Sequence, residues 1–177
     1  MANRKQELKR IEFEIILGKN VRSLAAAFMN MKSLEYVNLK DTSNVTDMSY
    51  MFYFTESFNQ SIENWDTSNV MNMSNMFYFA EAFNQPIGNW DTSKVYSMMF
   101  MFGDAYSFNQ PIGSWNTSNV EDMSHMFSGA SSFNQPINNW NTFMVKNIDN
   151  MFEEATAYSY PILEKSQYRR KKSTKSA

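Results

Sequence analysis

The chain has 177 residues, of which 43% are hydrophobic, and its formal net charge at pH 7 is −2. These totals suit one folded domain of ordinary size. The absence of cysteine excludes disulfides and thiolate metal sites, and no apolar run approaches the roughly 18 residues that a membrane-spanning helix needs.

Residues 1–20 are predicted to form an N-terminal capping segment. Ile11, Phe13 and Ile15 are separated by acidic residues, and this alternation predicts a strand. A helix over residues 5–16 is the alternative. Charged side chains stand where a secretion signal would have its apolar region, so the chain as written is expected to remain in the cytoplasm.

A period of 25 residues organises the next part of the chain, residues 21–163. Its landmarks are tryptophans, valines, Met-Phe pairs and Phe-Asn-Gln phrases. The tryptophans are Trp65, Trp90, Trp115 and Trp140, and the Met-Phe pairs begin at Met51, Met76, Met101, Met126 and Met151. A fixed period of this length is typical of stacked repeats. We therefore predict one degenerate unit and then five units that start near residues 40, 65, 90, 115 and 140.

Within a unit, the apolar residues follow a helical spacing of i, i+3, i+4, i+7 and i+10. In one unit these residues are Met73, Met76, Phe77, Ala80 and Phe83. Pro86 stops the expected helix, residues 87–90 are expected to form a brief strand, residues 91–94 a turn and residues 95–98 a second strand. The predicted fold class is an α/β repeat solenoid, a leucine-rich-repeat-like right-handed coil stack with short parallel strands and short helices.

The phrases WDTSNV and MSNMFYFAEAFNQPIGNWDTS, with their copies, closely resemble a known repeat. This is the 25-residue repeat of BspA-like leucine-rich-repeat proteins, in the variant abundant in mycoplasma-type surface lipoproteins. The resemblance covers roughly residues 21–163. It implies a leucine-rich-repeat-like fold, a place on the cell surface, and non-enzymatic binding of host or matrix components.

The tryptophans are the main candidates for contact with a partner. If a strand alternates after Ile87, then Trp90 points outward, and the indoles form a stripe suited to carbohydrate or protein. If the chain instead bends at residues 88–89, the indoles pack in the core, which avoids a row of exposed apolar rings. The candidate contacts beside the tryptophans are Glu63, Gly88, Gly113 and Asn138.

Repetition argues against a catalytic or metal site. His125 is the only histidine, and it has no accompanying nucleophile or carboxylate that the other units lack. Asp41, Asp66 and Asp91 recur at one position, where capping of a turn and calcium binding are the alternatives. The asparagines that follow each Phe are expected to bond to backbone groups or to one another. We predict no enzymatic activity, no cofactor, no metal and no small-molecule substrate.

The last segment, residues 164–177, is basic and is expected to be disordered. Its candidate contacts with nucleic acid or an acidic lipid surface are Arg169, Arg170, Lys171 and Lys172. Two functions therefore follow from the sequence. The first is a binding protein that presents an extended surface to a protein or a carbohydrate or matrix ligand. The alternative is an intracellular scaffold that acts through this tail.

Overall fold

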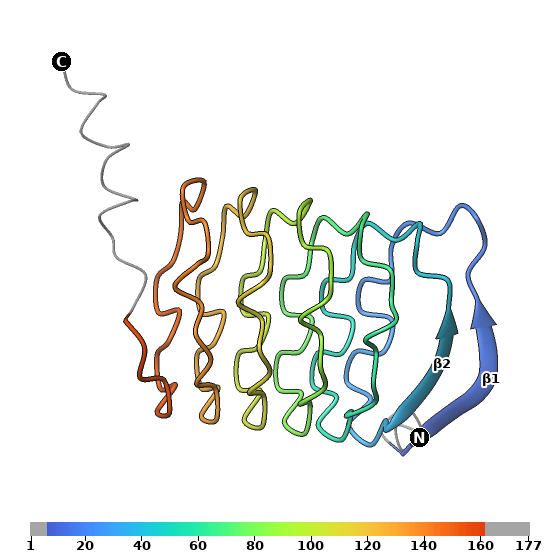
Figure 1. Ribbon diagram of the computed structural model, residues 1–177. Coiled ribbons are helices and arrows are strands. Elements are labelled where there is room, and N and C mark those ends of the chain that lie inside the picture. The colour runs from blue at the N-terminus through green and yellow to red at the C-terminus, as the bar shows by residue number, and fades with distance from the viewer. Residues whose placement is uncertain (1–6, 162–177) are drawn as a thin grey trace.

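The computed structural model describes residues 7–161, which contain two strands and no helix. Strands β1 (Arg10–Ile16) and β2 (Tyr36–Lys40) form a parallel two-stranded sheet. Figure 1 shows this sheet at the N-terminal end, followed by coils that lie one behind another along a single axis. This part of the chain has no helix of the length and apolar character that a bilayer crossing requires.

The predicted fold class, an α/β repeat solenoid with short helices, is wrong for the described residues. They contain no helix, and β1 and β2 are their only named strands. The strands expected at residues 87–90 and 95–98 are absent. Parallel pairing between successive coils is reduced to single bridges, which link Ser23, Asp47, Asn72, Ser97, Asp122 and Asn147 in that order.

Residues 73–80 show why a helical pattern does not produce a helix here. In a helix every N–H would donate to the carbonyl four residues earlier. In this segment the Met76 N–H donates to the backbone carbonyl three residues earlier at 3.2 Å. The Phe77 N–H instead donates to a backbone carbonyl of the next coil at 3.0 Å. Asn75 and Phe79 adopt left-handed backbone conformations, with φ of 58° and 55°. A chain of turns therefore directs the same apolar residues inward.

The N-terminal segment is a strand, as its alternation predicted, and not the alternative helix. Its pairing with β2 is irregular. Ile11 lies opposite Val37 and Ile15 lies opposite Leu39, so that four residues of β1 advance along only two of β2. This irregularity breaks the alternation, and Phe13, which the pattern places on the apolar face, is 73% exposed.

The core consists of ladders of equivalent side chains from successive coils. Phe52 and Phe77 stack with ring centroids 5.6 Å apart, and the same arrangement continues through Phe102, Phe127 and Phe152. A second ladder packs against the first, with Phe77 and Phe83 at 4.0 Å. The Met-Phe pairs thus fill the core as predicted, with Phe152 half-buried at the end. Each coil buries its apolar face against its neighbours, as stacked units must.

Candidate functional site

The tryptophan ladder lies in the core for most of its length. Trp90, Trp115 and Trp140 are each 4% exposed. Their indole N–H groups donate to backbone carbonyls of the preceding coil, and Trp115 Nε1 is 3.0 Å from the Ile87 oxygen. A tight turn closed by the Trp90 N–H and the Ile87 carbonyl brings each indole inward. The exposed stripe is therefore the wrong alternative for these three residues, which offer no ring face to a partner.

The other predicted contacts do not gather around the tryptophans in one surface. Trp65 is half-buried at the N-terminal end of the ladder, and Glu63 and Asn138 are exposed on turns. Gly88 and Gly113 are half-buried where neighbouring coils approach closely. An added Cβ would lie 2.5 Å from the Pro111 oxygen at Gly88 and 2.7 Å from the Pro136 oxygen at Gly113. Packing between the coils therefore accounts for the two glycines.

The recurring asparagines bond between coils, as expected. The Oδ1 atom of Asn59 accepts the backbone N–H of Asn84 at 2.9 Å, and Asn84 accepts that of Asn109 at 3.0 Å. The same bond repeats from Asn134 to Asn109 and from Ser159 to Asn134. Each asparagine thus satisfies a backbone donor of the following coil, which is a structural role.

The recurring aspartates cap turns. Asp91 Oδ1 accepts the backbone N–H of Ser93 at 2.9 Å, and Asp66 bonds to Ser68 in the same way at 3.0 Å. Hydrogen bonds from the serine side chain and backbone hold the pKa of each carboxyl below its ordinary value. Among residues 7–161, no three His, Asp or Glu side chains converge where they could hold a metal ion. The basic-tail candidates, Arg169, Arg170, Lys171 and Lys172, lie outside the described residues.

A different aromatic cluster covers one side of the turn chain, and the sequence pattern did not indicate it. We call it the aromatic face. Its members are Tyr50, Tyr53, Phe54, Tyr78, Phe79, Phe100, Tyr106 and His125, and none of them is buried. Neighbouring rings have centroids 4.3–6.3 Å apart, so the cluster is continuous across successive coils. The signal in the sequence was a set of aromatic residues at positions that vary between repeats.

His125 belongs to this face. Its ring stacks on Phe100 with centroids 4.3 Å apart and an interplanar angle of 2°. Its Nδ1 atom is 3.8 Å from a carboxylate oxygen of Glu153. The contacts of His125 are those of a surface aromatic residue beside an acidic one.

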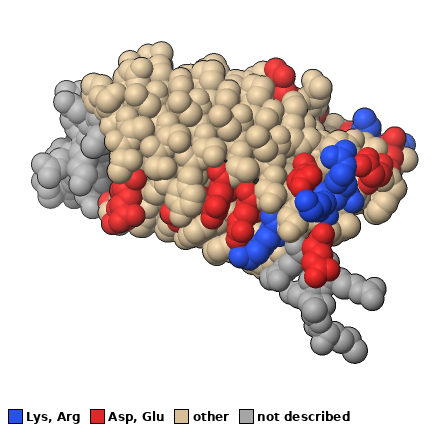
Figure 2. Space-filling view, turned by 90° about the horizontal axis from the view of Figure 1, so that it is seen from below, with Lys and Arg blue, Asp and Glu red and all other residues tan. Residues whose placement is uncertain are grey.

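Acidic side chains border the aromatic face. Burial raises the pKa of Asp104, and the charge of Glu154 raises it further, while a hydrogen bond with Tyr78 opposes the shift. Burial also raises the pKa of Tyr78 and Tyr106, and the nearby Asp104 charge adds to both shifts. Figure 2, which views the stack from below, shows acidic side chains spaced along one edge, whereas basic ones gather toward the N-terminal end.

Coils bonded to one another at a constant offset of 25 residues define a repeat protein. The chain belongs to the family described as Mycoplasma protein of unknown function, DUF285, whose model matches residues 22–127 and 87–176. The overlap of the two matches fits a repeat-bearing family. No curated protein and no solved structure matches the chain. The resemblance to BspA-like repeats is thus supported at the level of a repeat family.

Proposed function

We propose that this is a non-enzymatic binding protein that holds a protein partner on the aromatic face. The observation that carries the proposal is the continuity of these partly exposed rings across successive coils. Tyrosine and other aromatic side chains supply large contact area at low entropic cost, and they are enriched at the centres of protein interfaces. A monomeric protein seldom exposes such a patch without a use for it.

Backbone conformation supports the same proposal. Tyr50, Phe54, Phe79, Phe100 and His125 have φ between 53° and 58°. A left-handed conformation costs roughly 1–2 kcal/mol for an ordinary residue, and Gly or Asn adopts it more readily. Equivalent positions in other coils do hold Asn or Gly. The turns impose this conformation in every coil, including at Asn75, Asp104 and Glu154, so the aromatic residues stand at positions that would suit Gly or Asn better.

The charges around the face indicate what kind of protein it would bind. The border is acidic, with Asp104 close to the charges of Glu81 and Glu154. Lys32 already lies over the ring of Phe54 at 6.0 Å, so the face accepts a cation. Aromatic rings beside carboxylates favour lysine and arginine side chains. We therefore propose a partner segment that carries basic residues. Adhesion at the cell surface, which the BspA-like resemblance implies, is part of this proposal.

The test compares two double variants that remove similar exposed surface. Tyr50→Ser with Tyr106→Ser removes rings of the face that are 38% and 39% exposed. Met71→Ser with Tyr96→Ser removes side chains away from the face that are 47% and 45% exposed. Binding to arrays of basic, neutral and acidic peptides and of purified matrix proteins is measured for each. We expect the first variant to lose binding to basic partners by about tenfold or more, which corresponds to about 1.4 kcal/mol.

Equal binding by the two variants would count against the proposal, as would a preference for acidic peptides. Retention of polysaccharides but of no protein would replace the protein partner with a carbohydrate.

A further inference from the structure

A cavity of about 340 Å³ opens between β2 and residues 60–66. Its lining includes Lys40, Asp41, Asn64, Trp65 and Asp66, and it shares no residue with the aromatic face. We call it the Trp65 groove. Its volume is at the lower end of the range for small-ligand sites, which is about 300–1,000 Å³.

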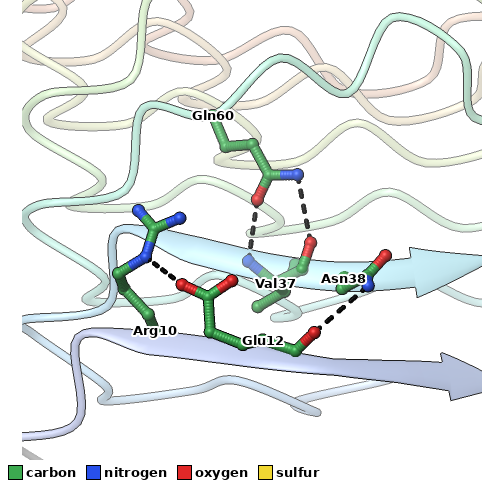
Figure 3. A network of polar contacts seen from close by, with 5 residues as sticks. All are labelled: Arg10, Glu12, Val37, Asn38 and Gln60. Carbon is green, nitrogen blue, oxygen red and sulfur yellow. Dashed lines mark hydrogen bonds and ion pairs between the residues drawn. The ribbon is translucent and has the colours of Figure 1, made fainter.

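The groove lies beside the sheet that β2 forms with β1. Figure 1 shows the two strands curving together away from the coils. The side chain of Gln60 bridges the space that this leaves: its Oε1 accepts the Val37 N–H at 2.7 Å, and its Nε2 donates to the Val37 carbonyl at 3.0 Å. Figure 3 shows this bridge, with Asn38 of β2 bonded on its other side to Glu12 of β1.

Trp65 differs from the later tryptophans in the hydrogen bonding of its indole. Each of the others donates its indole N–H to the carbonyl 28 residues earlier. For Trp65 the equivalent carbonyl is that of Val37, which accepts from the Gln60 side chain instead. Among residues 7–161, no acceptor bonds to the indole N–H of Trp65, and the side chain is only half-buried. The ladder therefore ends in an indole that lines the groove with a free donor.

The other lining groups combine neutral and charged hydrogen-bonding atoms. Asn64 and Lys40 are exposed. Asp41 and Asp66 each cap a turn through one oxygen, which leaves further lone pairs free to accept. The pKa of Asp66 lies below its ordinary value, mainly because the Ser68 side chain donates to it, so this carboxylate is ionised at neutral pH. An aromatic wall with amide and carboxylate atoms suits a ligand rich in hydroxyl groups.

We infer that the Trp65 groove is a carbohydrate subsite that takes a neutral hexose or N-acetylhexosamine residue. The apolar face of the sugar packs on the Trp65 indole, whose N–H donates to a ring or hydroxyl oxygen. Sugar hydroxyls donate to the carboxylates of Asp41 and Asp66, and Asn64 supplies both a donor and an acceptor. Because two carboxylates face one lysine, acidic sugars bind less well.

The first experiment applies the full chain to glycans that end in glucose, galactose, mannose, N-acetylglucosamine or sialic acid. We expect retention of at least one neutral class and no retention of the sialylated one. A bound neutral sugar should also protect the protein from acrylamide quenching of fluorescence, because Trp65 is the one tryptophan of the four that is not buried. No retention of any neutral glycan, or stronger retention of sialylated ones, would overturn the inference.

Variants then locate the site on the chain. Asn64→Ala should weaken binding of the retained glycan at least fivefold. Asn139→Ala, which removes an exposed asparagine at the equivalent position of another coil, should leave binding unchanged. Trp65→Phe keeps a ring beside Phe52, at 6.0 Å in the native protein, but removes the N–H, and should also weaken binding. Equal losses in the two asparagine variants, or unchanged binding in both Asn64→Ala and Trp65→Phe, would refute the subsite. The Tyr50→Ser and Tyr106→Ser variant should still bind the glycan, which separates this inference from the proposed function.

Discussion

Replacing Trp115 by Ala tests whether the tryptophan ladder holds the coils together. Truncation of a buried aromatic side chain to Ala costs about 3–5 kcal/mol. The variant also loses the hydrogen bond from the indole to the Ile87 carbonyl, at 3.0 Å, which is worth about 1 kcal/mol. We expect the free energy of unfolding to fall by about 4–6 kcal/mol. Trp65→Ala should cost about 2 kcal/mol, since Trp65 is half-buried and lacks that bond.

Urea unfolding followed by circular dichroism measures both losses, and comparison of m-values shows whether the coils still unfold together. Trp115→Phe retains a ring against Phe102 and loses only the N–H and some volume, so its stability should fall between those of the wild type and Trp115→Ala. A loss below about 1 kcal/mol for Trp115→Ala would refute the role of the ladder. So would equal losses at the two tryptophans.

Three further changes test the turns and the charges. Gly129→Ala should lower the urea midpoint, because Gly129 has a φ of 72° and a Cβ there would lie 2.2 Å from Asp104 Oδ1. Gly18→Ala is the control and should leave the midpoint unchanged, because a Cβ there would have nothing within 4 Å. Similar midpoint shifts in the two variants would contradict this reasoning. Hydrogen bonds from Ser93 lower the pKa of Asp91 in the folded protein. The ionised Asp91 therefore stabilises the fold above the pKa that it has in the unfolded chain, and this stabilisation is lost as pH falls through its pKa in the folded protein. Asp91→Asn should keep the turn and should flatten the acid side of a plot of unfolding free energy against pH. An unchanged slope on the acid side would count against this role of Asp91. The pKa of Asp104 is raised, first by burial, so its contribution is present at low pH and is lost as pH rises through the folded pKa. Asp104→Asn should therefore raise the thermal midpoint at pH 7 but not at pH 3, and the reverse order would be inconsistent with that shift.

The sequence predicted the inner surface of the coils better than their backbone. Repetition predicted the Met-Phe ladders and the bonded asparagines, and it gave turn capping as one of two alternatives for the aspartates, because each coil needs the same group at the same place. The helix was wrong because spacings of three and four residues also bring side chains to one side of successive turns. The difference from a helix is that every second N–H group donates to a carbonyl of the next coil, 24 residues later. Asn75 and Gly129, which favour left-handed backbone, were the available signs of this conformation.

The aromatic face was missed for a different reason. A search for repetition gives weight to positions that stay constant, whereas Tyr50, Phe100 and His125 share one position with Asn75 and Asn150. Only the stacking of the coils makes neighbours of aromatic residues that belong to separate repeats. The sequence did not decide whether the tryptophans are buried, because a straight strand would point the indole outward and a bend at residues 88–89 would point it inward. The structure has a turn there, so the indole points inward.

The constant offset of the contacts also determines how the length of such a protein can change. Each asparagine bonds to the residue 25 positions later, whichever coil it belongs to. Deletion or duplication of one whole unit therefore returns every donor to an equivalent acceptor, whereas a change of one residue shifts the register of all the coils that follow. The extent of the surface is set by counting units, and its chemistry by the few positions that differ among them. The length of the stack and the chemistry of its exposed positions are thus separate variables in this architecture.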